Sequence, residues 1–237
     1  MKTNILKKVR LDLKKNVDEK TKLSFQRFFK EKVKAYGVKS NIVGKIANEG
    51  FNEIKELDKK EIFELCEELF KSGYCEESFI ASNWTYKCSK YFKPSDFKIF
   101  VRWIDKYINN WAECDTFCNH TMGAFIEMFP KFVQDLKKLT LSKNRWVKRA
   151  SAVSLIIPAK KGMFLKDIFD IADKLLVDPD DMVQKGYGWM LKESSRTNQN
   201  EVFNYVVQNK KRMPRTALRY AIEKMPESMR KKAMKLD

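Results

Sequence analysis

Apolar residues recur at helical spacing along most of the chain, and this pattern constrains the fold more than any other feature. In Glu61–Lys71, the residues Ile62, Leu65, Cys66 and Leu69 fall at i, i+3, i+4 and i+7, so they share one helix face. The same spacing predicts four further helices, over Phe97–Ile108, Phe125–Leu136, Phe164–Leu176 and Val202–Val207. Strict alternation does not persist between Asn-Gly or Asp-Gly turns, which argues against strands. The sequence therefore predicts an all-α fold.

The breaks between the periodic segments have residues typical of loops and turns. They fall at Tyr36-Gly37, Lys71–Tyr74, Phe92–Ser95, Thr140–Lys143, Lys160–Gly162, Asp178–Asp180 and Met213-Pro214. Ser95 and Asp180 precede periodic segments and are predicted helix N-caps.

The breaks group the helices roughly in pairs, and the second helices of the pairs resemble one another. These segments read EESFIASNW, DTFCNHTMG, KRASAVSLI, QKGYGWMLK and RTALRYAIE. Their register marks Glu76, Asp115, Lys148, Gln184 and Arg215 are 39, 33, 36 and 31 residues apart. Irregular repeats of this length are typical of α-solenoids, in which each pair buries its apolar face on its neighbours. We predict a curved α-solenoid of HEAT-like helical pairs that forms a single domain over residues 1–237.

Positive charge is concentrated in the C-terminal half. The chain has 48 Lys and Arg against 31 Asp and Glu, a net charge of +17, and residues 136–166 contain nine cations and no acid. The positive charges in such a run repel one another, and no acid within the run balances them. A bound polyanion would supply the balancing negative charge. An anionic membrane is the alternative, but it would need an amphipathic helix with exposed bulky apolar residues. The cations are spread over several helical segments, which favours a nucleic acid.

The sequence also indicates a soluble protein of a reducing compartment. No apolar run approaches the ~18–20 residues that span a bilayer, and Asp12 interrupts the basic N-terminus before any signal-type core. The five cysteines are an odd number and form no CxxC pair. Cys114, Cys118 and His120 supply only three metal ligands, so core packing is favoured over zinc and no metal is expected. We predict a cytoplasmic location, with association to the nucleoid when bound to DNA.

The usual catalytic motifs are missing from the sequence. It contains no GxGxxG, P-loop, GxSxG or HExxH motif and a single His, so any enzyme activity must depend on carboxylates, aromatic residues and cations. Trp111 and Asp115 are four residues apart and share a helix face, where an apolar residue would be expected instead of Asp115. The alternative is that Asp115 caps its helix and Trp111 belongs to the core. Arg149 and Trp189 lie on the next two second helices, and the four side chains could converge on one groove.

Three segments resemble the AlkD-type DNA alkylation repair proteins, the HEAT-like-repeat DNA glycosylases. They are NWAECD (Asn110–Asp115), RWVKRA (Arg145–Ala150) and VQKGYGWMLKE (Val183–Glu193), and their order and spacing match the family over essentially the full length. The resemblance implies that Asp115 is the catalytic carboxylate, Trp111 and Trp189 the aromatic pair at the lesion, and Arg149 the groove cation. Candidate DNA-binding residues, with Arg149, are Arg145, Lys148 and Lys185; Lys148 can equally be a solvated lysine.

The resemblance further implies a monofunctional DNA glycosylase that excises cationic N3- and N7-alkylpurines, such as 3-methyladenine and 7-methylguanine, from duplex DNA. It implies no metal or organic cofactor and no deep pocket for a flipped base. We expect a monomer without an obligate protein partner. Two alternatives are a non-catalytic solenoid that binds structured DNA or RNA through the same basic groove, and a protein-binding scaffold.

Overall fold

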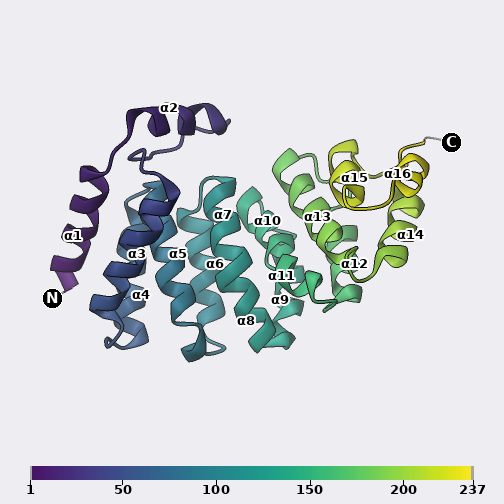
Figure 1. Cartoon of the computed structure of the whole chain (residues 1–237). Coiled ribbons are helices and arrows are strands. Elements are labelled where there is room, and N and C mark those ends of the chain that lie inside the picture. Colours follow the sequence, from purple (N-terminus) through teal and green to yellow (C-terminus); the bar gives the residue numbers. More distant parts are fainter. Residues whose placement is uncertain (1, 236–237) are drawn as a thin grey trace. The chain divides into compact units, whose positions relative to one another are not determined.

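A computed structural model describes residues 2–235, and no strand occurs in this range. One isolated parallel bridge joins Lys34 to Tyr74. The chain forms two compact units, Met1–Phe117 and Cys118–Asp237. Each unit consists of paired helices, so the predicted all-α solenoid fold is confirmed (Figure 1). The prediction of one domain over the whole chain stays a prediction.

The first unit contains seven α-helices among its described residues. They are α1 (Lys2–Lys15), α2 (Glu19–Phe28), α3 (Ser40–Ile54), α4 (Lys59–Lys71), α5 (Cys75–Lys87), α6 (Asp96–Tyr107) and α7 (Trp111–Phe117), with a 3-10 helix, η1, over Ser89–Tyr91. Helices α3, α5 and α7 pack in sequence as one layer, and α4 and α6 form the layer beside them. The second helices of the predicted pairs are therefore neighbours, as the repeat pattern requires.

The second unit also consists of paired helices. Its helices are η2 (Cys118–Met122, a π-helical turn), α8 (Gly123–Met128), η3 (Pro130–Phe132, 3-10), α9 (Val133–Leu139), α10 (Arg145–Val153), α11 (Ile156–Lys160), α12 (Leu165–Leu175), α13 (Asp181–Ser194), α14 (Gln199–Asn209), α15 (Arg215–Ile222) and α16 (Glu227–Met234). Helix α13 packs against both α10 and α15, and α12 packs against α9. These contacts define two layers, with the second helices again in one of them.

Two of the local predictions need correction. The expected helix over Phe125–Leu136 is wrong as a single helix: α8 ends at Met128, and Pro130, which cannot donate a backbone hydrogen bond, starts the 3-10 turn before α9. Ser95 occupies the N-cap position of α6, but its side chain makes no capping bond. The Asp96 carboxylate instead accepts a hydrogen bond from the Lys93 N–H at 2.8 Å. Asp180 caps α13 as predicted, and accepts from the N–H groups of Met182 and Val183.

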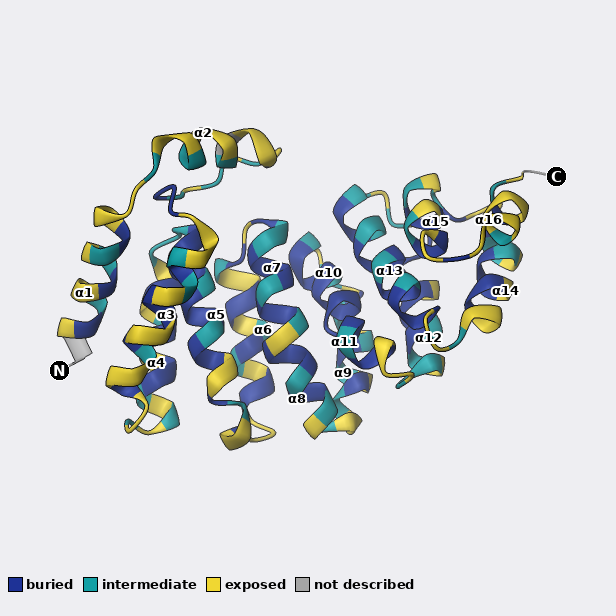
Figure 2. Cartoon of the chain, viewed as in Figure 1, coloured by how far each residue is buried: buried dark blue, intermediate teal, exposed yellow. Residues whose placement is uncertain are grey.

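Large aromatic side chains fill the core of the first unit. Trp84, Trp103, Phe70, Phe100 and Phe117 are fully buried. Trp84 also donates to the Ala47 carbonyl at 2.8 Å, which satisfies its indole N–H. Figure 2 shows that α5 and α7 are mostly buried, whereas α2 is mostly exposed.

Helix α2 is held to the rest of the first unit by the segment that follows it. The buried Glu76 carboxylate on α5 accepts hydrogen bonds from three successive backbone N–H groups, those of Tyr36, Gly37 and Val38, at 3.0, 2.8 and 3.1 Å. Gly37 has φ +90°, and a Cβ there would lie 2.4 Å from the Lys22 Cβ of α2. Only glycine fits both this backbone conformation and this close approach.

Candidate functional site

The predicted catalytic pair lies at the start of α7. Helix α7 begins at Trp111, and the Asn110 side-chain oxygen accepts a hydrogen bond from the Glu113 N–H at 3.0 Å. This is an N-cap bond, because it satisfies a backbone donor of the first helical turn. Trp111 and Asp115 therefore follow one another by one turn on the same face, as their spacing predicts. Asp115 is buried, with 9% of its surface still exposed.

Two phenylalanines from the α2 region cover Trp111. The ring centroids of Phe28 and Phe29 are 5.4 and 5.5 Å from that of Trp111, which is itself half-buried. Phe29 is buried, whereas Phe28 is 69% exposed. Trp111 is thus one member of an aromatic cluster that reaches the surface, rather than an isolated core residue.

A second carboxyl group, that of Glu113, lies on the same helix, and the sequence reasoning missed it. Glu113 is 1% exposed, and burial raises its pKa to about 7, although hydrogen bonding, first of all from the Asn109 N–H, lowers it. The Asn109 N–H donates to Glu113 Oε2 at 3.3 Å. The spacing Asn110-x-x-Glu113 is that of a capping box, and this signal could have identified the residue from the sequence.

The candidate metal ligands do not gather into a site. Cys114 and Cys118 are buried, whereas His120 is exposed. Among residues 2–235, no three His, Cys, Asp or Glu side chains are placed to hold a metal ion.

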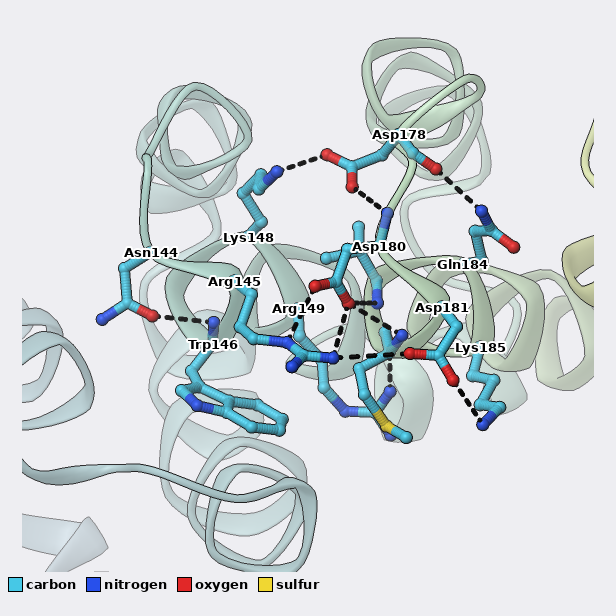
Figure 3. Close-up of polar contacts among 12 residues, drawn as sticks. Asn144, Arg145, Trp146, Lys148, Arg149, Asp178, Asp180, Asp181, Gln184 and Lys185 are labelled. Carbon is cyan, nitrogen blue, oxygen red and sulfur yellow. Dashed lines mark hydrogen bonds and ion pairs between the residues drawn. The ribbon is translucent and has the colours of Figure 1, made fainter. Parts of the chain in front are cut away.

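Three of the four predicted DNA-binding cations of the second unit pair with acids of that unit (Figure 3). Arg145 Nε lies 2.8 Å from Asp180 Oδ2, and its Nη2 lies 3.4 Å from Asp181 Oδ1. Lys148 Nζ lies 2.5 Å from Asp178 Oδ2, and Lys185 Nζ lies 3.1 Å from Asp181 Oδ2. All three cations therefore hold carboxylates at the N-terminal end of α13.

These ion pairs show that cations of the acid-free run, residues 136–166, have acidic partners within the protein. The expectation that nothing in the chain balances their charge is wrong. The acids come from other repeats: Lys137 pairs with Asp167 and Asp170, and Lys161 pairs with Glu127. The partners of Arg145 and Lys148 also lie 30–36 residues later in the chain. Since this separation is about one repeat, an acidic segment one repeat after a basic one is a signal that could have been read from the sequence.

Arg149 is more buried than the other three predicted DNA-binding cations. It is 4% exposed, and its Nη1 donates to the Met182 carbonyl of α13. A Cβ at Gly186 would lie 3.2 Å from the Arg149 Cγ. The absence of a side chain at Gly186 therefore gives Arg149 room between α10 and α13.

Trp189 on α13 is half-buried, and Lys192 lies over its ring at 6.0 Å from the centroid. Gly188 beside it packs against α15, where a Cβ would lie 2.8 Å from the Ala217 carbonyl oxygen. The two glycines of this helix thus allow close approach of the Arg149 side chain at Gly186 and of the α15 backbone at Gly188. Trp111 and Asp115 belong to the first unit and Arg149 and Trp189 to the second, so their convergence on one groove stays a prediction.

No helix within the described residues is both long and apolar enough to cross a membrane. The layered helical pairs place the chain among the all-α solenoid proteins. Residues 9–225 match the model of the DNA alkylation repair enzyme family, and the chain belongs to this family.

A solved structure shares the fold. A predicted DNA alkylation repair enzyme from Enterococcus faecalis is similar over 90% of this chain and 98% of its own, with a TM-score of 0.80 and 14% sequence identity. None of the curated proteins matches the chain.

Proposed function

We propose that the protein is a monofunctional DNA glycosylase that removes cationic N3- and N7-alkylpurines, such as 3-methyladenine and 7-methylguanine, from duplex DNA. Membership of the DNA alkylation repair enzyme family supports DNA damage of this type as the substrate class. The observation that carries the proposal is the start of α7, where a largely buried carboxyl group, that of Asp115, lies one turn from the aromatic cluster of Trp111.

The chemistry needs few groups because the substrate is already activated. A purine alkylated at N3 or N7 carries a positive charge, so when its bond to C1′ breaks, the electron pair goes to the base and a neutral base leaves. Most glycosidases need an acid to protonate the leaving group, but here that acid is dispensable. The remaining tasks are to stabilise the oxocarbenium-like sugar and to place a water molecule that adds at C1′.

Asp115 performs both tasks in the proposed mechanism. Its ionised carboxylate stabilises the developing positive charge and accepts a proton from the attacking water. The indole faces of Trp111 and Trp189 favour the same charge, each by about 1–2 kcal/mol in a dry site. Arg149 binds a DNA phosphate and takes no part in bond cleavage.

The proposal assigns DNA contact to Arg145, Lys148 and Lys185 as well. In the structure these cations hold Asp178, Asp180 and Asp181, so binding of a phosphate would exchange one anionic partner for another. Such an exchange costs little for Arg145 and Lys185, whose ion pairs are partly exposed and screened by water, and more for the less exposed pair of Lys148 and Asp178.

The direct test is incubation of the purified protein with methylated duplex DNA, followed by chromatography of the freed bases. We expect 3-methyladenine and 7-methylguanine in excess of a duplex sample without protein, which measures spontaneous depurination. The same duplex without methylation should yield no base. Saturation of the duplex by the protein without released base would refute the proposal and favour the non-catalytic solenoid.

A further inference from the structure

Glu113 is a buried carboxyl group that the proposed reaction does not use. It is 1% exposed, and its Oε1 atom has no hydrogen-bond partner among the described residues. A buried carboxyl oxygen without a partner is costly, so this residue needs an explanation.

The backbone bonds around Glu113 define the start of α7. Asn110 Oδ1 accepts from the Glu113 N–H at 3.0 Å, and Glu113 Oε2 accepts from the Asn109 N–H at 3.3 Å. The Asn110 carbonyl accepts from the Cys114 N–H at 3.2 Å. The Asn110 side chain thus caps the Glu113 N–H, and the Glu113 side chain reaches back to the residue before Asn110. These two bonds, which resemble a capping box, fix the first turn of the helix that carries Trp111 and Asp115.

The groups that face Glu113 make its charge sensitive to pH near neutrality. Cys75 on α5 is the titratable neighbour; burial raises the pKa of its thiol, and the Glu113 carboxylate raises it further. Glu76, the next residue of α5, directs its carboxylate to the backbone N–H groups of Tyr36, Gly37 and Val38. The loop before α7 adds the neutral amides of Asn109 and Asn110. Burial therefore raises the pKa of Glu113 to about 7, and both its forms are populated at neutral pH.

The two forms differ in how firmly they hold the helix start. An ionised Glu113 accepts a charge-assisted hydrogen bond from the Asn109 N–H and interacts favourably with the N-terminal end of α7. A protonated Glu113 accepts the same bond more weakly. Ionisation thus strengthens the hydrogen bond at the turn from which Trp111 projects and after which Asp115 follows, although burial makes the ionised form the less stable one overall.

We propose that Glu113 is a positioning residue for Trp111 and Asp115, and that base release becomes faster as Glu113 loses its proton. The second part of this inference rests on the proposed glycosylase function. The first part concerns the protein alone and can be tested without any substrate.

The test of positioning uses fluorotryptophan-labelled protein and 19F NMR between pH 5.5 and 8.5. The Trp111→Phe variant identifies the Trp111 resonance among those of the five tryptophans. We expect this resonance to shift with a midpoint near pH 7 in the wild type and to stay constant in Glu113→Gln. The Glu56→Gln variant, an exposed residue of the same unit, should titrate as the wild type does. A Trp111 resonance that does not shift, or that shifts equally in Glu113→Gln, would overturn the inference.

The test of the rate uses single-turnover base release from methylated duplex at the same pH values. If only the ionised form is competent, the wild-type rate rises about tenfold between pH 6 and 8, after subtraction of spontaneous depurination. Glu113→Gln keeps an acceptor for the Asn109 N–H but cannot ionise, so its profile should be flat, with DNA affinity unchanged. Glu113→Ala should be slower at every pH. If the rate of base release by Glu113→Gln rises with pH as the wild-type rate does, the proposed role of Glu113 is refuted.

The two measurements separate the possible failures. If the wild type releases no base but its Trp111 resonance titrates through Glu113, the glycosylase proposal fails and the positioning role stands. If base is released but neither the resonance nor the rate depends on Glu113, the glycosylase proposal stands and the positioning role fails.

Discussion

The start of α7 and the contact between α10 and α13 differ in what surrounds their charged side chains. At α7, Glu113 and Asp115 are both buried, and burial raises the pKa of Glu113 to about 7. Between α10 and α13, Arg145, Lys148 and Lys185 each lie within 3.4 Å of a carboxylate oxygen. The first region holds a carboxyl group, that of Glu113, whose protonation changes near neutral pH, whereas the second holds cations that are paired with carboxylates. This difference suits chemistry at the first region and exchangeable anion binding at the second.

The largest effect that we expect from this difference is on the free energy of unfolding, through Glu113 on α7. The pKa of Glu113 is about 7 in the folded protein and 4.5 ordinarily, so folding raises it. The folded state then keeps its proton where the unfolded state has lost it, and the free energy of unfolding falls as pH rises from about 4.5 to 7. We expect Glu113 to contribute about 2–3 kcal/mol to this fall. Urea unfolding at pH 5 and pH 8 should show it in the wild type.

The control for this prediction is Glu113→Gln, which cannot titrate. Its loss of stability between the two pH values should be smaller than that of the wild type by the same amount. An equal loss in both proteins would mean that Glu113 ionises as an ordinary surface carboxyl does, and the contrast between the two regions would disappear.

A smaller effect is expected at Arg149, the buried member of the α10–α13 region. Arg149→Ala should bind DNA about tenfold more weakly, and the slope of log affinity against log salt should fall by about one phosphate contact. Fluorescence anisotropy with a labelled duplex over a salt series measures both quantities. An unchanged slope would count against the placement of Arg149 at the DNA.

The smallest effect is expected from removal of an internal partner. Asp178→Asn releases Lys148 from its carboxylate, so DNA should bind about twofold to fivefold more tightly at low salt. Glu56→Gln makes the same change in net charge at an exposed position of the first unit. It therefore measures how much of the gain in DNA affinity comes from net charge alone. If both variants bind alike, Lys148 makes no contact with DNA.

Much of the fold could be predicted because each helix carries its own apolar face. The segment Phe164–Leu176 became α12 (Leu165–Leu175) with one residue's difference at each end. The error at Phe125–Leu136 arose because its periodicity was given more weight than Pro130, which interrupts the backbone hydrogen bonds.

The sites were harder to predict, since they depend on contacts between repeats. The spacing of Trp111 and Asp115 follows from helix geometry alone, and their shared face could be read directly. The ion pairs of Arg145 and Lys148 need the register between neighbouring repeats, which helical periodicity does not contain. The burial of Glu113 likewise depends on how α5 packs against α7.

The central claim is that Asp115 promotes loss of the alkylated base. Its most direct test is the single-turnover rate of 7-methylguanine release by Asp115→Asn, with DNA affinity measured on the same protein. The account predicts a rate lower by about a hundredfold to a thousandfold at unchanged affinity, as for removal of other groups that stabilise a charged transition state. The exposed α6 variant Asp105→Asn, with the same change in charge, should keep the wild-type rate. A wild-type rate in Asp115→Asn would contradict the account.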